Sequence, residues 1–315
     1  MVDGARAGVA FVFPGQASQR SGMATELLAR EPAARELFRR AGELLGLDLA
    51  DLCTTGSDAL LTRTDIAQPA LLTTSLGWLE VLRARGIAPQ MVAGHSLGEF
   101  CAWVAAGALE FEEAVRLVRR RGELMAEAGE RRPGGMLAVI GLTDARVAEI
   151  CREVQRAGVI VIANHNSPGQ VVVSGEPAAL EGAAEAVRRE RGRAIPLRVS
   201  GAFHSPLMED AARSFADIVS RLPVRPPTIP VVANATAEPV TDPDRVREAM
   251  MRQMDSPVLW TASVRRMVGD GIGTFVEVGP GHVLTKLIPR ISTEAEAIAV
   301  DGMEGLQALM EVMNR

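Results

Sequence analysis

Residues 91–106, MVAGHSLGEFCAWVAA, decide how the chain folds. Residues 91–93 form a short apolar run typical of a strand, and residues 99–106 favour a helix. Between them, Gly94, Ser96 and Gly98 match the pattern Gly-x-Ser-x-Gly. In that pattern a tight turn from strand to helix exposes the serine hydroxyl, and the next backbone N–H can stabilise an oxyanion. The stretch predicts a nucleophile at Ser96; the alternative is an ordinary turn between a strand and a helix.

Strands and helices alternate on both sides of this turn. Residues 9–13 form a β-type run that stops at Pro14-Gly15, and residues 274–278 form another that runs into Gly279-Pro280-Gly281. A further strand is expected at 229–233. Helices are expected at residues 23–45, 67–85, 99–106, 112–130 and 244–254. Residues 264–269 are expected to end another helix, and a final helix starts from Val283. Strands that alternate with helices favour a largely parallel sheet. The predicted fold class is therefore α/β.

The order of predicted strands and helices changes after Arg132-Pro133-Gly134-Gly135. From there the pattern is strand, helix, strand, strand, helix, strand, which is the order of a ferredoxin-like unit. These elements are expected at residues 136–140, 144–157, 159–163, 170–174, 177–191 and 194–199. We expect a small inserted subdomain at residues 134–199, between the two parts (1–133 and 200–315) of a larger catalytic domain.

Composition excludes several classes of protein. The chain has 315 residues, 47% of them hydrophobic and 23% charged, as in ordinary globular enzymes. Its net charge of 34 − 39 = −5 gives no general attraction to nucleic acid. No apolar run approaches the ~20 residues that cross a membrane, and the N-terminus lacks the features of a secretory signal. We expect a cytoplasmic protein that binds neither nucleic acid nor membrane.

The cysteines and histidines give no metal-binding pattern. Cys53, Cys101 and Cys151 lie far apart and form no Cys-x-x-Cys motif, so a zinc site or a disulfide framework is not expected. Reduced thiols of this kind fit a cytosolic protein. The four histidines show no spacing of the His-Glu-x-x-His type.

A serine nucleophile needs a base, and four histidines are available. His95 lies within the turn, and its side chain should point away from Ser96. His165 lies in a loop of the expected insert, and His282 lies at a helix start, where protonation is disfavoured. His204, in Gly201-Ala202-Phe203-His204-Ser205-Pro206, lies where the chain leaves the insert. The pattern leaves His204 open between a catalytic and a structural role.

Six motifs, taken together and in order, resemble the malonyl-CoA:acyl carrier protein transacylase family, which includes the free-standing acyltransferases of polyketide synthases. The motifs are Phe13-Pro14-Gly15-Gln16, Gly94-His95-Ser96-Leu97-Gly98-Glu99, Arg121-Gly122, Asn166-Ser167-Pro168-Gly169-Gln170, Gly201-Ala202-Phe203-His204-Ser205 and Glu277-Val278-Gly279-Pro280-Gly281. The match spans residues 8–291. It implies an α/β-hydrolase-like domain with a parallel sheet and a ferredoxin-like insert, in agreement with the pattern above.

The resemblance also implies the roles of six residues. Ser96 would be the nucleophile, and His204 would be the general base, oriented by the backbone carbonyl of Gln253 in place of an acidic residue. The backbone N–H groups of Gln16 and Leu97 would form the oxyanion hole. Arg121 would grip the free carboxylate of a malonyl group with two parallel hydrogen bonds, which lysine cannot imitate. The alternative is that Arg121 belongs to a solvated helix face.

Two positions bear on the choice of acyl group. Phe203 and Leu97 match the pattern of malonyl-selective members of the family. A bulky Phe203 would occupy the space that an α-methyl branch needs, so malonyl is expected over methylmalonyl. A pocket distinguishes one methyl group by only about 1–3 kcal/mol, which predicts a leaky preference.

The resemblance implies two-step transfer of malonyl from malonyl-CoA, through a Ser96 ester, to the phosphopantetheine thiol of an acyl carrier protein. It implies no bound cofactor, and we expect a monomer. Such carrier proteins are generally acidic, so the arginines of the insert, Arg188 and Arg189 among them, are candidates for docking. A serine thioesterase and a non-catalytic scaffold are the competing interpretations, and the residues do not separate fatty acid from polyketide synthesis.

Overall fold

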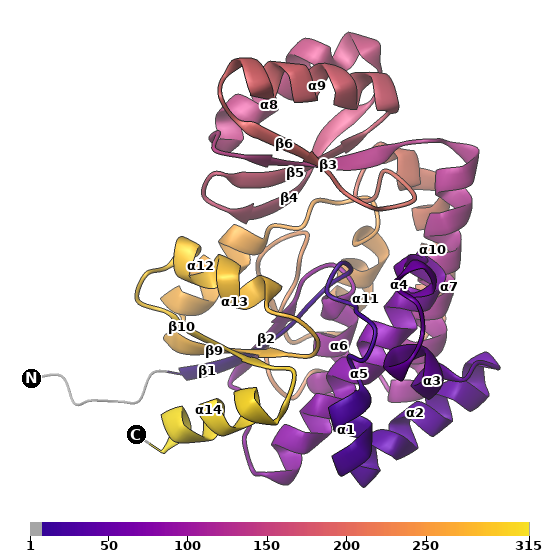
Figure 1. The fold of residues 1–315 in the computed structure, drawn as a ribbon, viewed down its shortest axis with the longest axis vertical. Coiled ribbons are helices and arrows are strands. Elements are labelled where there is room, and N and C mark those ends of the chain that lie inside the picture. Colours follow the sequence, from indigo (N-terminus) through magenta and orange to yellow (C-terminus); the bar gives the residue numbers. More distant parts are fainter. Residues whose placement is uncertain (1–7, 315) are drawn as a thin grey trace, which may run out of the picture.

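Two sheets organise residues 8–314, which are the residues that the computed structural model describes (Figure 1). The large sheet has the strand order β10-β9-β1-β2-β7-β8, and neighbouring strands are parallel except for β7 and β8. Its strands are β1 Gly8–Phe13, β2 Met91–Gly94, β7 Val231–Val232, β8 Pro239–Val240, β9 Ile272–Val278 and β10 Glu296–Val300. The predicted α/β class with a largely parallel sheet is confirmed.

Helices cover the large sheet on both faces (Figure 1). Those outside the insert are α1 Thr25–Arg30, α2 Pro32–Leu45, α3 Leu49–Thr54, α4 Asp58–Thr62, α5 Thr64–Ala84, α6 Gly98–Ala105, α7 Phe111–Arg131, α10 Glu209–Val219, α11 Pro243–Arg252, α12 Trp260–Gly269, α13 Val283–Ile291 and α14 Met303–Met313. Two short 3₁₀ helices, η1 Gln155–Ala157 and η2 Pro206–Met208, complete the connections.

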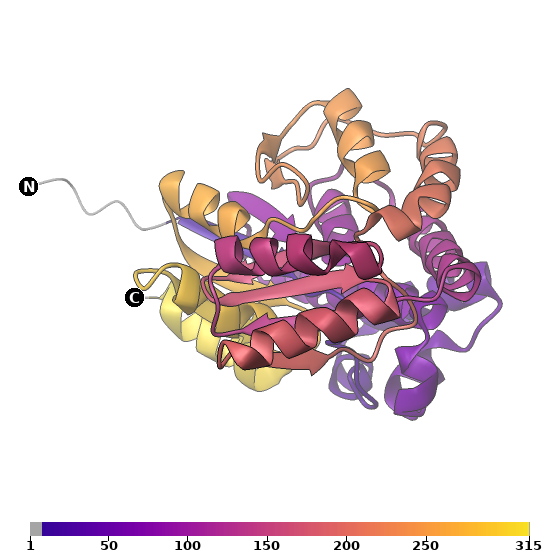
Figure 2. The same cartoon turned by 90° about the horizontal axis from the view of Figure 1, so that it is seen from above.

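The small sheet is antiparallel, with the strand order β4-β5-β3-β6. Its elements are β3 Gly135–Ile140, α8 Asp144–Val154, β4 Ile160–Ser167, β5 Gln170–Gly175, α9 Pro177–Arg189 and β6 Arg193–Pro196. This is the order of elements predicted for a ferredoxin-like unit. The two helices lie side by side on the outer face of the small sheet, and its other face turns toward the large body (Figures 1 and 2).

Strand β1 shows why the central strands are apolar along their whole length. Phe11 and Phe13 point into the core on one face of the large sheet. Ala10 and Val12 point into the core on the other face. Because helices cover both faces, the strand has no solvent side and no polar alternation.

Several boundaries differ from the sequence prediction. The helix expected at 23–45 is two helices, because the chain is extended at Glu31 and Pro32 starts α2. The helix from Val283 is not the last element, since α13 ends at Ile291 and is followed by β10 and α14. The short amphipathic helices α3, α4 and α10 were not predicted.

Glu277 joins strand β9 to helix α13. Its side chain is fully buried, and its two carboxyl oxygens accept hydrogen bonds from the backbone N–H groups of Val283, Leu284 and Thr285 at 2.8–3.1 Å. The Thr285 hydroxyl donates a further bond of 2.8 Å. Three otherwise orphan donors of the helix N-terminus are thereby satisfied.

We expect Glu277→Ala to destabilise the fold by about 2–3 kcal/mol, because it leaves buried N–H groups without acceptors. Thermal unfolding should then occur at a temperature roughly 4–6 °C lower. The control is Glu296→Ala, which changes an exposed carboxylate on β10. Equal melting temperatures for both variants would contradict the capping role of Glu277.

Candidate active site

Ser96 sits in a turn that only small neighbours allow. A Cβ atom at Gly94 would lie 1.9 Å from the carbonyl carbon of Gly98, and one at Gly98 would lie 2.1 Å from the carbonyl oxygen of Phe13. Ser96 itself has φ = 52°, in the left-handed region that serine rarely adopts. Strand β2 therefore ends, turns and enters α6 within four residues, as expected for a nucleophile turn.

His204 is the histidine that reaches Ser96. Its Nε2 atom lies 2.8 Å from Ser96 Oγ, and its Nδ1 atom lies 3.0 Å from the carbonyl oxygen of Ser256. A carbonyl oxygen can only accept, so Nδ1 carries the hydrogen and Nε2 accepts from the serine hydroxyl. Like Ser96, His204 has a positive φ, of 56°. The geometry is that of a nucleophile paired with a base.

The acceptor that orients His204 differs from the expectation. We expected the carbonyl of Gln253, but the hydrogen bond from Nδ1 goes to Ser256, and the Gln253 carbonyl acts on the ring more weakly. Gln253 still has the helical backbone conformation that ends α11 (φ −65°, ψ −29°), and the chain reaches the ring three residues later. The expected carbonyl acceptor is present: Ser256 accepts the hydrogen bond from Nδ1, and the Gln253 carbonyl also stabilises the ring proton.

Gln253 instead acts through its side chain. Its Oε1 atom accepts hydrogen bonds from Nε and Nη2 of Arg121, at 3.1 and 2.6 Å. Its Nε2 atom donates to the carbonyl oxygen of Ser96 at 2.6 Å. The buried amide thus joins the arginine to the backbone of the turn.

The environment of His204 keeps the ring neutral. Burial lowers the pKa of His204 to about 3, and the positive charge of Arg121 contributes to the decrease. The carbonyl of Ser256 opposes this effect but does not reverse it. At neutral pH the ring is therefore free to accept a proton from Ser96.

Arg121 is buried without a carboxylate partner. Its side chain is 1% exposed, and Nη1 donates to Gln68 Oε1 at 2.8 Å, beside the bonds to Gln253. Nη2 also lies 3.3 Å from Ser96 Oγ, and the guanidinium lies over the ring of Phe100. Among residues 8–314, no Asp or Glu oxygen lies within 4 Å of it in an ion pair. The alternative that Arg121 lies on a solvated helix face is therefore wrong.

The two backbone N–H groups expected to form an oxyanion hole are available. Within residues 8–314, neither the N–H of Leu97 nor that of Gln16 donates to a protein acceptor. Gly15 brings the second loop against the turn, since a Cβ atom there would lie 2.5 Å from the carbonyl oxygen of His95. The Thr64 hydroxyl holds the side chain of Gln16 at 2.9 Å.

A cavity of about 500 Å³ opens onto Ser96 and His204. Its lining comes from both sheets: β3, β4 and β5 of the small sheet form one wall, and the loop after β1 and helix α13 contribute to the other. Phe203 lines the cavity, whereas the side chain of Leu97 is 1% exposed and packs in the core. The structure therefore supports a role in acyl selectivity for Phe203 more than for Leu97.

Other sequence candidates lie elsewhere. His95 points to Asn166, as expected away from Ser96, His165 pairs with Asp144, and His282 lies at the start of α13 near Asp301. Arg188 and Arg189 occupy the last turn of α9, on the outer face of the small sheet (Figure 1).

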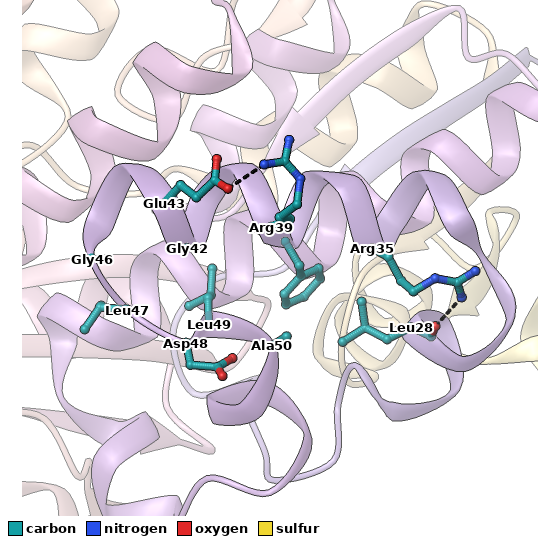
Figure 3. A pocket seen from close by; sticks show the side chains of 11 residues that line it. Leu28, Arg35, Arg39, Gly42, Glu43, Gly46, Leu47, Asp48, Leu49 and Ala50 are labelled. Atoms are coloured by element: carbon teal, nitrogen blue, oxygen red, sulfur yellow. Dashed lines mark hydrogen bonds and ion pairs between the residues drawn. The ribbon is translucent and has the colours of Figure 1, made fainter.

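A hollow of about 710 Å³ lies over α2 and α3 and contains no catalytic pair (Figure 3). Its charged side chains are already engaged: Arg39 pairs with Glu43, and Arg35 donates to the carbonyl of Leu28. This larger hollow is therefore not the candidate site.

Comparison with known proteins agrees with this geometry. The family profile described as "Acyl transferase domain" matches residues 10–306. The chain belongs to the acyl transferase family. It is 41% identical over 308 residues to a malonyl CoA-acyl carrier protein transacylase of Bacillus subtilis, covering 97% of each chain.

Solved structures support the same assignment. An acyl carrier protein S-malonyltransferase from Vibrio cholerae superposes with a TM-score of 0.92 at 39% identity, covering 96% of this chain and 100% of that one. A malonyl-transacylase solved in complex with a type II polyketide synthase acyl carrier protein superposes with a TM-score of 0.93 at 39% identity, covering 97% and 99%. The resemblance predicted from the six motifs is confirmed.

Asn234 is a site residue of this acyl transferase that the sequence analysis missed. Its Oδ1 atom accepts from the Ser96 N–H at 2.7 Å, and its Nδ2 atom donates to the Gly94 carbonyl at 2.6 Å. The backbone carbonyl of Asn234 accepts a hydrogen bond from the N–H of Leu259, three residues after Ser256. One side chain therefore links both sides of the turn to the segment that orients His204. Its position directly after a strand of the parallel sheet was the available signal.

We expect Asn234→Ala to slow the reaction of Ser96 with a fluorophosphonate probe by roughly 10- to 100-fold, or about 1.4–2.7 kcal/mol. The reason is that the strained turn loses the bond that fixes the Ser96 N–H. The rate of covalent labelling, followed by mass spectrometry, measures the effect.

Ser263→Ala is the matched control, because that buried hydroxyl donates to the Leu259 carbonyl at 3.0 Å without contacting the turn. It should label at the rate of the unmodified protein. Unchanged labelling of Asn234→Ala would refute the positioning role.

Proposed function

We propose that this protein transfers a malonyl group from malonyl-CoA to the phosphopantetheine thiol of an acyl carrier protein. One observation carries the proposal: Ser96 Oγ lies 2.8 Å from the His204 base and 3.3 Å from the guanidinium of Arg121. A nucleophile and a base that line one cavity, with an unneutralised cation buried against the nucleophile, suit an acyl group that ends in a carboxylate. Relatives named for this reaction, at about 40% identity, support it.

In the first half-reaction Ser96 Oγ attacks the thioester carbon. His204 Nε2 takes the hydroxyl proton as the new C–O bond forms, and the carbonyl oxygen becomes an oxyanion held by the N–H groups of Leu97 and Gln16. The C–S bond then breaks, and the imidazolium returns its proton to the CoA thiolate. The products are CoA thiol and a malonyl ester on Ser96.

In the second half-reaction the carrier-protein thiol replaces CoA. His204 removes its proton, the thiolate attacks the ester carbon, and the C–O bond to Ser96 breaks. The proton on His204 returns to the serine oxygen. Free enzyme and malonyl carrier protein result, and the covalent intermediate makes the kinetics ping-pong.

The competing activity is that of a serine thioesterase, which would use the same Ser96 and His204 with water as the acceptor. A hydrolase for neutral acyl chains gains nothing from a buried arginine, and burying that cation costs free energy. Arg121 therefore favours transfer of an anionic acyl group. A non-catalytic scaffold would have no use for the strained Ser96 either.

The site needs one chain only, because Ser96, His204 and Arg121 come from the same polypeptide, and we propose that the enzyme acts as a monomer. Cys53, Cys101 and Cys151 are buried free thiols, which fits a cytoplasmic location. No helix within residues 8–314 is long and apolar enough to cross a membrane. The malonyl units would serve fatty acid or polyketide synthesis.

Incubation with malonyl-CoA should leave a malonyl adduct on Ser96, detectable by mass spectrometry of the intact protein and its peptides. Addition of a phosphopantetheinylated carrier protein should discharge the adduct and leave malonyl on the carrier thiol. Ser96→Ala should form no adduct. Rapid release of free malonate without transfer would establish the thioesterase instead.

Phe203→Ser should shift the ratio of kcat/KM for malonyl-CoA over methylmalonyl-CoA toward methylmalonyl by roughly tenfold, within the about 1–3 kcal/mol that one methyl group is worth. The buried phenyl ring of Phe203 lines the cavity beside His204, and its loss opens space for a branch. An unchanged ratio would remove Phe203 from acyl selection.

A further inference from the structure

Glu99 is a buried acid that the transfer reaction does not use. It lies in the first turn of α6, three residues after Ser96, and is 1% exposed. Its Oε1 atom accepts a hydrogen bond from the Asn234 N–H at 2.9 Å. Its Oε2 atom is buried and has no hydrogen-bond partner within residues 8–314. No ion pair within 4 Å involves it in the part of the chain that the structure describes.

This setting favours the neutral form of Glu99. An ionised carboxylate in a dry interior needs hydrogen bonds on both oxygens or a cation in contact, and Glu99 has one hydrogen bond. Burial accordingly raises the pKa of Glu99 to about 8, although the Asn234 N–H and the charge of Arg121 act in the opposite direction.

Arg121 is the charge that acts on Glu99 among the described residues. Strands β1 and β2, which pack on α6, contribute no titratable side chain. The buried rings of His95 and His204 have lowered pKa values and are neutral. The charged side chains of α5 are paired elsewhere, namely Asp65 with Arg63 and Arg119, and Glu80 with Arg83.

The ionisation of Glu99 therefore decides whether the charge of Arg121 is available to another carboxylate. Both are buried, and Phe100, the residue after Glu99, lies under the guanidinium of Arg121. While Glu99 is neutral, Arg121 keeps its full charge for an incoming carboxylate. Once Glu99 ionises, the two carboxylates compete for one cation in a low-dielectric pocket.

We propose that Glu99 determines the selectivity of the enzyme for an anionic acyl group: its protonated form leaves Arg121 free to bind the malonyl carboxylate, and its ionised form competes with that carboxylate. The inference rests on the proposed function. It assigns Glu99 a positioning role, through Arg121, and no direct contact with the substrate.

The competition has a defined direction with pH. Below about pH 8 Glu99 is mainly protonated, and above that value it ionises. Because apparent affinity scales with the competent fraction, kcat/KM for malonyl-CoA should fall about tenfold between pH 7 and pH 9. Acetyl-CoA has no carboxylate and does not need Arg121, so transfer of acetyl is the internal reference.

The experiment measures kcat/KM for malonyl-CoA and acetyl-CoA from pH 6 to pH 9 in the unmodified enzyme, in Glu99→Gln and in Glu123→Gln. The upper limit stays below the pKa of Arg121, which burial lowers to about 10. Glu123 is a partly exposed acid of α7 that pairs with Arg119 and Arg120, so it is the matched control. Between pH 7 and pH 9 the malonyl-to-acetyl ratio should fall about tenfold in the unmodified enzyme and in Glu123→Gln. It should stay flat in Glu99→Gln.

The same fall with pH in Glu99→Gln would overturn the proposal. Absence of any malonyl preference at pH 7 in the unmodified enzyme would instead refute the proposed function, so the two failures are distinguishable. Melting temperature and fluorophosphonate labelling of Ser96 show whether Glu99→Gln is folded.

A second measurement needs no change at Glu99. Calorimetry of Ser96→Ala at pH 8.5, in two buffers of different ionisation enthalpy, reports protons taken up on binding. Malonyl-CoA should bind with proton uptake, and acetyl-CoA should bind without it. Equal proton uptake for the two ligands would also overturn the proposal.

Discussion

The structure depends on one constraint: a strand must become a helix within four residues while it presents a serine hydroxyl to a histidine. The close approach of Gly94 to Gly98, and of Gly98 to Phe13, leaves no room for a Cβ atom, and Ser96 takes a left-handed conformation that has to be held in place. Asn234 and Gln253 supply the restraint, with bonds of 2.6–2.7 Å to the backbone on either side of the hydroxyl. Asn234 is placed by strand β7, and Gln253 is placed by the end of helix α11.

Electrostatics supports the same geometry. The buried guanidinium of Arg121 is held by neutral amides of Gln68 and Gln253, so its hydrogen bonds are satisfied while its charge is not. That charge helps to keep His204 unprotonated, although burial is the larger cause of its low pKa. Arg121 thus prepares the base and offers a site for an anion at the same time.

Much of the fold could be predicted from patterns of neighbouring residues in the sequence. The turn at residues 94–98, the central strands and the order of elements in the small sheet follow from apolar runs and glycine positions, which are properties of neighbouring residues. The roles of Ser256 and Asn234 come from contacts with distant segments, and the only local signal was the position of Asn234 after a strand. The sequence placed His204 in a loop and left its role open. Its hydrogen bond to Ser96 joins residues 108 positions apart, and only the fold determines that contact.

The cavity lies between the two sheets, so the residues that react and the residues that bound the space for the acyl chain come from different parts of the fold. The reactive serine follows strand β2 of the large sheet and its base lies in the loop before η2, while Met136, Ala138 and Val172 on the small sheet form the opposing wall. Substitutions in those strands can reshape the space for an incoming acyl chain without disturbing the reactive pair. The range of substrates can therefore change through the small sheet, while the close packing of the Ser96 turn limits substitutions in the large domain.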